Sequence, residues 1–241
     1  MYEELKNHGV TEETPKNIML GAGTLHKNFY FGYYEPCEST TSNKLKVVAD
    51  NATPTSGEVK LSEAQKKCAT TLKVNDYVLL VNKWNFANSL IGATSGGNKL
   101  SIVPEIVTVE VDGALVKVKG LDFKQGETAK LETNLVEITP ELLKTTVIGK
   151  IVDSDIEGYD LIESKSSIEN GDYYENLAFV GKKTDGTPII VIFDNALCTT
   201  GFEGEAKNKE NTVVKCTFEC YQDPTADLSK LPYHIYYPSQ S

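Results

Sequence analysis

The sequence predicts a mainly β fold with few and short helices. Val, Ile, Thr and Tyr recur along the 241 residues together with 18 glycines, a composition typical of strands and turns. Asp-Gly and Gly-Gly pairs separate runs in which apolar and polar residues alternate. The hydrophobic content of 40% is enough for a folded core, and the length allows one large β domain or two domains.

A hairpin centred on Asp112-Gly113 is the clearest local prediction. Asp-Gly is a preferred pair for a two-residue type I′ turn. Residues 99–111 would form one strand and residues 114–120 the other. The pairs set opposite one another on the valine-rich face would be Val111 with Ala114, Val109 with Val116, and Val107 with Val118. The period of two then separates this face from a mixed polar face.

The next elements are a strand and a helix. Residues 127–138 continue the alternating pattern and predict a strand. Thr139 followed by Pro140 is typical of a helix start, with Thr as the N-cap and Pro at the first helical position. We expect this short helix to run to about Ile148 and to be stopped by Gly149.

Residues 176–197 predict a second hairpin, with its loop near Asp185-Gly186. The run from Ile189 to Phe193 has no polar face, so we expect it to be buried on both sides. A last strand covers residues 212–221. Its alternation places four residues on one side, namely Val214, Cys216, Phe218 and Cys220.

Three segments differ from this pattern. Residues 35–75 are polar and rich in turns, which predicts a long excursion from the sheet. Ser62 and Gln65 fit a capping box, and Ala64, Cys68 and Leu72 recur as on one helix face, so the excursion should carry a short helix. Residues 1–27 and 222–241 are expected to be an N-terminal and a C-terminal arm.

The charge excludes several classes of partner. The formal net charge is −10 and the isoelectric point about 4.9, without any basic cluster, which argues against binding to a phosphate backbone. The longest apolar runs, 77–81 and 189–193, are too short to span a membrane. The polar start MYEELKNHGV does not resemble a signal peptide, and five cysteines, an odd number, favour a reduced cytosolic environment.

No metal or catalytic motif emerges from the histidines and cysteines. His8, His26 and His234 have no metal-ligand spacing. Cys216 and Cys220 are four residues apart, which is roughly 13 Å along a strand. A disulfide needs Cα atoms within about 7 Å, so we expect these two thiols to lie in the core.

The carboxylates and glycines also lack a specific motif. We expect the acidic groups at 153–157 and 203–205 to form solvated surface. Asp153 and Asp155 loosely resemble the start of a calcium loop, but Ser164 stands where the loop needs Glu. The stretch Gly92–Asn98 matches neither a P-loop nor a dinucleotide fingerprint and is expected to be a turn. The sequence thus predicts no catalytic, cofactor-binding or metal-binding residues and no enzymatic activity.

An ordered set of motifs resembles the major tail tube proteins of long-tailed bacteriophages. The set begins with the glycine-rich opening at 17–29 and continues with G-A-T-x-G-G at 92–97, V-D-G at 111–113 and K-G at 119–120. It ends with the element LVEITPELL at 135–143, the hairpin at 176–197 and the ending PYHIYYPS at 232–239. The resemblance runs with gaps from about residue 17 to 238, and residues 35–75 have no counterpart in it.

This resemblance implies a single tail-tube-like domain over residues 1–241, with a β-sandwich or barrel core and a short flanking helix. Such subunits form hexameric rings that stack into a hollow tube in the virion tail, assembled in the cytoplasm of the host bacterium. The implied partners are further copies of the chain, the tape-measure protein and the tail-tip and terminator proteins, with no membrane. DNA would pass the lumen without specific binding, since six copies carry a formal charge of −60.

Two other classes of function remain open. A monomeric β-sandwich module could bind a carbohydrate or another ligand through Trp84, Tyr33, Tyr34 and the aromatic group at 233–237. A hydrolase with a carboxylate pair would need two acidic side chains that converge in a cleft. Against the binding module, we expect the aromatic residues to pack in the core or between subunits.

Overall fold

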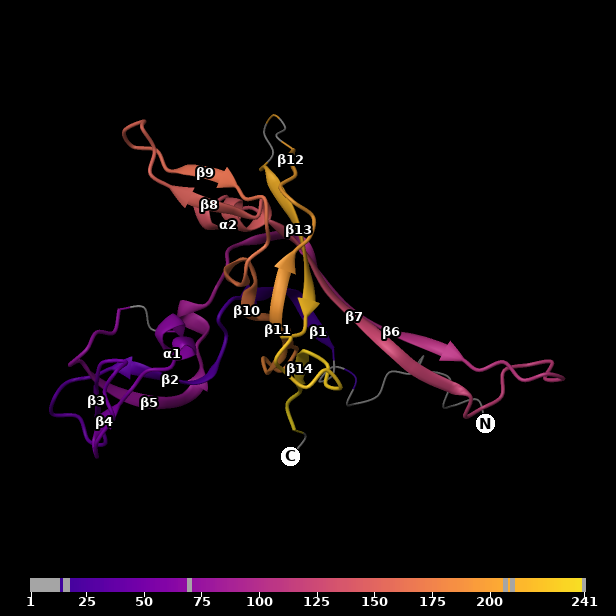
Figure 1. Cartoon of the computed structure of the whole chain (residues 1–241), viewed down its shortest axis with the longest axis horizontal. Coiled ribbons are helices and arrows are strands. Elements are labelled where there is room, and N and C mark those ends of the chain that lie inside the picture. Colours follow the sequence, from indigo (N-terminus) through magenta and orange to yellow (C-terminus); the bar gives the residue numbers. More distant parts are fainter. Residues whose placement is uncertain (1–13, 15–17, 69–70, 206–207, 209–210, 240–241) are drawn as a thin grey trace.

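The computed structural model describes residues 14, 18–68, 71–205, 208 and 211–239. The secondary structure is mainly β with few helices, as the sequence predicts. In the described part of the chain the strands form three sheets (Figure 1). Residues 1–13, which include His8, and residues 15–17 lie outside the described residues.

The main sheet is antiparallel and curls into a half-barrel. Its strands, in spatial order, are β1 (Met19–His26), β10 (Tyr174–Lys183), β11 (Pro188–Cys198), β13 (Val213–Tyr221), β7 (Asp122–Leu135) and β6 (Thr94–Thr108). Two short strands join it, β12 (Gly204–Glu205) beside β13 and β14 (Tyr233–Tyr236) beside β11. The curl brings the two edge strands together at one point, where the Asn98 side-chain amide donates to the Ala22 carbonyl over 2.7 Å.

β11 is shared by two separate apolar clusters. Val191 and Phe193 belong to the larger cluster, which includes Leu131, Phe218 and residues of β1, β10 and β13. Ile190 and Ile192 belong to a second cluster around Phe29. The alternation along β11 therefore buries both faces of the strand, which confirms the expectation for residues 189–193.

The predicted hairpin of residues 176–197 is confirmed. β10 pairs with β11 in a continuous antiparallel register, and the Gly186 amide donates to the Lys183 carbonyl over 2.9 Å in the turn. The last predicted strand is β13. Val214, Cys216 and Phe218 are buried in the larger cluster, and Cys220 packs against the same cluster.

The predicted hairpin around Asp112-Gly113 is wrong in its register. β6 pairs with β7, so Val107 lies opposite Phe123 rather than Val118, and Thr108 lies opposite Asp122. Residues 109–121 form a long connection without strand pairing, although a turn is present at Asp112-Gly113. The local valine pattern favours pairing of residues 99–111 with the adjacent residues 114–120. Pairing with β7 is preferred in the structure, and β7 also carries Leu131 and Leu135 into the core.

The helix after β7 is the one that the sequence predicts. α2 (Pro140–Thr146) begins after Thr139, whose hydroxyl accepts a hydrogen bond from the Leu142 amide over 3.1 Å. α2 buries Leu142 in the larger cluster. The two-stranded sheet that follows consists of β8 (Gly149–Val152) and β9 (Leu161–Ser164), and a 3-10 helix (Asn170–Asp172) then leads into β10.

The excursion at 35–75 contributes to a second, four-stranded sheet. Its strands, in order, are β2 (Phe31–Pro36), β5 (Tyr77–Trp84), β3 (Leu45–Val47) and β4 (Glu58–Val59), and a 3-10 helix (Phe86–Asn88) follows β5. α1 (Glu63–Cys68) has the predicted capping box, in which Ser62 and Gln65 exchange two hydrogen bonds. Tyr34, Val47, Leu61 and Val78 form the apolar cluster of this unit.

Candidate assembly surfaces

The β6/β7 ribbon leaves the main sheet as a long projection. Beyond the Glu105–Gly126 pair β7 carries one extra residue, Gln125, and the register shifts. We call residues 106–124 the arm and its end, residues 109–121, the arm tip. Among the described residues no third strand pairs with the arm (Figure 1).

The arm tip exposes apolar side chains. Leu115 is fully exposed at 100%, and Val116 is 78% exposed. Five further apolar residues of the arm have at least two fifths of their surface exposed, namely Ile106, Val109, Val111, Val118 and Phe123. Exposed apolar groups gathered on one projection are typical of a surface that another molecule covers.

Backbone turns give the arm tip a defined shape. The Val109 amide donates to the Leu121 carbonyl over 2.9 Å, and the Ala114 amide donates to the Val111 carbonyl over 3.2 Å. Gly113 has a positive φ of 87°, whereas Asp112 does not, so this is not the type I′ turn that the sequence predicts. The tip surrounds a hollow of about 520 Å³ that residues 108–118 and Leu121 line.

Side chains fasten the base of the arm to the body. The Tyr233 hydroxyl of β14 donates to Glu127 Oε2 over 3.0 Å. Lys124 is also bonded to this carboxylate. The two hydrogen bonds lower the pKa of Glu127, and the bond from Lys124 lowers it more than the bond from Tyr233 does. The C-terminal strand therefore helps to set the direction in which the arm projects.

The β8/β9 hairpin forms a second projection. Lys150 and Glu163 pair across the two strands at 3.0 Å, and the connection at residues 153–160 is the β8/β9 tip. Ile156 and Tyr159 are 64% and 71% exposed. The tip also holds four exposed acidic residues and no basic residue, the acids being Asp153, Asp155, Glu157 and Asp160.

The two projections leave the main sheet on opposite sides. In Figure 1 β8 and β9 extend to the upper left, whereas the arm extends to the lower right. The arm tip therefore cannot meet the β8/β9 tip of its own chain.

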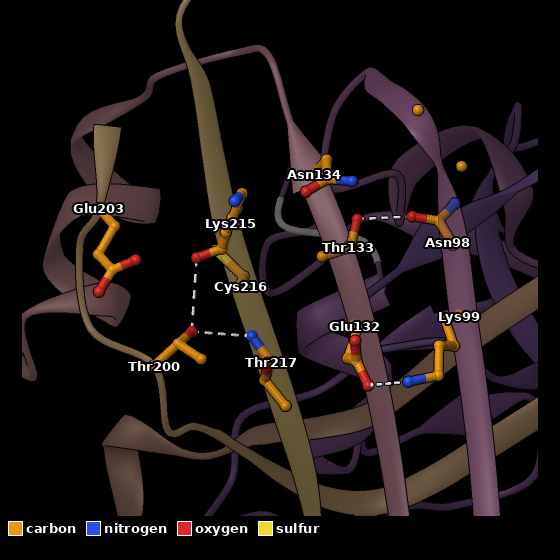
Figure 2. A pocket seen from close by; sticks show the side chains of 12 residues that line it. Asn98, Lys99, Glu132, Thr133, Asn134, Thr200, Glu203, Lys215, Cys216 and Thr217 are labelled. Atoms are coloured by element: carbon orange, nitrogen blue, oxygen red, sulfur yellow. Dashed lines mark hydrogen bonds and ion pairs between the residues drawn. The ribbon is translucent and has the colours of Figure 1, made fainter. Parts of the chain in front are cut away.

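A polar groove of about 330 Å³ crosses the strands β6, β7 and β13 (Figure 2). Lys99 and Glu132 form an ion pair over its floor at 2.7 Å, and Thr133 donates to Asn98 Oδ1 over 2.6 Å. At the other side the Thr200 hydroxyl accepts from the Thr217 amide over 2.9 Å. These polar groups satisfy one another, and the lining residues include no histidine that could serve as a base beside Cys216.

The glycine-rich stretch at 92–98 leads into β6, which begins at Thr94 and contains Gly96 and Gly97. A register shift lies between Thr94 and Asn98, and Gly96 and Gly97 have positive φ values of 78° and 88°. The two glycines therefore form an irregularity at the rim of the groove, with a backbone conformation that other residues rarely adopt.

The histidines within the described residues have structural contacts. His26 is buried, with Nδ1 at 2.8 Å from Ser89 Oγ and Nε2 at 2.9 Å from Thr24 Oγ1. Burial lowers the pKa of His26 to about 4. His234 lies 3.1 Å from Asp194, whose pKa is raised by burial. Sequence reasoning missed both partners, since neither Ser89 nor Asp194 is a neighbour of its histidine in the chain.

The five cysteines are free thiols. Cys216 is buried in the core as predicted, and Cys220 donates its thiol to the Pro232 carbonyl over 3.1 Å. Cys216 also lies beside Cys198 of the neighbouring strand, and the interaction between the two thiols lowers the pKa of Cys198 and raises that of Cys216. Sequence reasoning missed this thiol pair, because strand register alone brings the two residues together.

The structure brings together only part of the aromatic group that the sequence suggests as a platform, namely Trp84 and the half-exposed Tyr236. Tyr33 and Tyr34 are buried, and Tyr233 is turned to Glu127. Trp84 stacks on Phe29 with ring centroids 5.0 Å apart and meets the edges of Phe31 and Tyr236. One face of the indole is therefore already covered within the chain.

The two acidic groups at 153–157 and 203–205 do not converge with each other either. Asp153, Asp155 and Glu157 lie on the β8/β9 tip, and Glu203 lies at the polar groove near the β12 end of the main sheet. Within the described residues no cluster of three or more His, Cys, Asp or Glu side chains could hold a metal ion. No described helix is long and apolar enough to cross a membrane.

No protein-family model matches this chain, and no curated protein matches it either.

Proposed function

We propose that this chain is the repeating subunit of the tail tube of a bacteriophage or phage-like particle. Copies of it would assemble as stacked hexameric rings around a hollow conduit for DNA. The observation that carries the proposal is the pair of exposed projections, the arm and the β8/β9 hairpin, which leave the curled sheet on opposite sides. A protein with two such surfaces is suited to repeated contacts between identical copies.

The edges of the main sheet also support repeated association. β6 and β1 are the edge strands, and the last part of β1 is bonded to residues 89–91 of the same chain, so the freer edge is that of β6 in the arm. An unpaired edge is a ready template for the backbone of another chain. A contact between two different surfaces is heterologous, and such contacts close into a ring when the rotation permits.

The charge supports passage of DNA rather than binding. The formal charge of −10 per copy gives −60 for a ring of six. An acidic tube repels phosphates and discourages DNA from adhering during delivery. Within a virion tail, assembled in the bacterial cytoplasm, the further partners would be the tape-measure, tail-tip and terminator proteins.

Electron microscopy of the concentrated protein in negative stain tests the proposal. We expect hollow rings or tubes of uniform diameter, together with light scattering that rises with concentration. A tail-tip assembly should be added as a nucleator in a parallel sample. A chain that stays monomeric at all concentrations, with and without the nucleator, would contradict the proposed function.

A further inference from the structure

We infer that the arm tip of one copy docks on the β8/β9 tip of a second copy. The inference rests on the proposed function, because it names the contact by which identical subunits would join. It follows from three features of the two tips: their charges, their shapes and their positions on the fold.

The second half of the arm tip and the β8/β9 tip are complementary in charge, whereas the first half of the arm tip carries Glu110 and Asp112. The outer half of the arm tip, residues 114–121, contains Lys117 and Lys119 and no acidic residue, and both lysines are exposed. The β8/β9 tip carries four exposed acidic residues. None of these six side chains has an ion-pair partner among the described residues. Opposite charges on two surfaces steer their encounter and fix their register.

The shapes are also complementary. The arm tip folds around a hollow of about 520 Å³, whose lining includes Val111, Leu115 and Val116. The β8/β9 tip instead protrudes and presents Ile156 and Tyr159. Each apolar group buried from water adds about 25 cal/mol per Å² of apolar surface. Insertion of these two side chains into the hollow would therefore cover exposed apolar surface on both partners.

The positions of the tips exclude a contact within one chain. The two projections point away from each other from opposite sides of the main sheet (Figure 1). The acidic tip and the lysine-bearing tip can meet only when they belong to different copies. The resulting contact is heterologous, so every copy both donates an arm and receives one.

A charge-swap experiment tests the contact in the full-length protein. The double variant Lys117→Glu, Lys119→Glu should raise the concentration needed for assembly at least tenfold, since attraction becomes repulsion at the acidic tip. Adding Asp155→Lys and Glu157→Lys to the same chain should restore the attraction. The concentration needed for assembly should then return to within about threefold of that of the unmodified protein. The matched control is Lys60→Glu, Lys73→Glu, which makes the same change in net charge on exposed lysines of the second-sheet unit.

The charge swap overturns the inference if the Lys117, Lys119 variant assembles like the Lys60, Lys73 control. It also overturns the inference if the four-residue swap does not recover assembly that the double variant has lost. A general effect of added negative charge would appear equally in both double variants, so the control separates it from a local contact.

Photocrosslinking gives a readout that does not require tubes. A photoreactive phenylalanine analogue at Leu115 should capture a second copy, and the captured peptide should lie within residues 151–161. Tubes without this crosslink would overturn the docking contact but leave the proposed function intact. The crosslink without rings or tubes would support the contact and count against the tube, and the lack of both would overturn both.

Discussion

The Tyr233 hydroxyl donates a hydrogen bond to Glu127 across 3.0 Å and thereby ties the C-terminal strand to the base of the arm. The two residues are 106 positions apart in the chain. β14, which carries Tyr233, is itself paired with β11 in the centre of the main sheet. The direction of the arm is thus connected to the core through a short terminal strand.

Removing this hydroxyl should loosen the arm. In Tyr233→Phe, we expect hydrogen exchange of the backbone amides at residues 122–128 to become severalfold faster, because local opening no longer has to break this bond. Tyr236→Phe is the matched control on the same strand, since its ring packs against Trp84 and its hydroxyl has no bond among the described contacts. Equal exchange in the two variants would contradict the bracing role of Tyr233.

Replacing the arm tip should abolish assembly without unfolding the body. Thr108 and Asp122 lie opposite each other, so an Asn-Gly turn can join them in place of residues 109–121. We expect the circular dichroism spectrum and the cooperative unfolding transition to be retained, because the two main-sheet clusters lose none of their members. Tubes of normal length from this variant, seen by negative-stain microscopy, would rule out a role of the arm in assembly.

The N-cap of α2 should contribute measurably to stability. Thr139→Ala removes the hydroxyl that accepts from the Leu142 amide and should lower the free energy of unfolding by about 1 kcal/mol. Urea denaturation followed by circular dichroism measures the change. Thr139→Ser keeps the acceptor and should lose much less, so equal losses in both variants would show that the cap bond does not matter.

Buried His26 should make the protein less stable in mild acid. The pKa of His26 is lowered to about 4 in the fold, against 6.5 in the unfolded chain. Between these pH values the unfolded state binds more protons, so stability is full above about pH 6.5 and falls as the pH drops toward 4. Urea titrations at several pH values measure this slope, and His26→Gln, which has no titrating group, should flatten it. An unchanged slope in the variant would assign the pH dependence to other groups.

Cys37 should be the first cysteine to react with a mild thiol reagent. It is only partly buried, whereas Cys68, Cys198 and Cys216 are buried. Cys220 is also partly buried, but burial raises its pKa to about 12 and its thiol is hydrogen-bonded. The lowered pKa of Cys198 does not make this buried thiol react early, since a reagent must also reach the sulfur. A colorimetric thiol assay should show one fast phase that Cys37→Ser removes, and a fast phase that survives would contradict this order.

The sequence predicts those elements in which a local signal agrees with the burial pattern. At Asp185-Gly186 the turn pair stands between two runs that are both buried, and the hairpin forms as expected. Thr139-Pro140 starts a helix because capping depends on neighbouring residues alone. At Asp112-Gly113 a turn also forms, but β6 pairs with β7 and not with the residues just after the turn. The core contacts of β7 involve residues far away in the chain, so the local sequence does not reveal this pairing.

The candidate surfaces could be predicted only in part. The valines of 107–118 were visible as a pattern, but their exposure follows from the arm leaving the sheet beyond the register shift at Gln125. The acidic residues at 153–157 were expected to be solvated, and they are exposed. Their position opposite the arm depends on how α2 and β8 turn away from β7, for which local sequence carries no signal.

One uninterrupted stretch of chain, residues 109–160, contains both tips. β7 begins directly after the arm tip, and its other end leads through α2 into β8. Tension applied between neighbouring copies would therefore travel along a covalent backbone from one tip to the other. The hydrogen bonds between β7 and its neighbouring strands would then only hold this stretch in position. They would not have to carry the load themselves, as they would if the strands were pulled past one another.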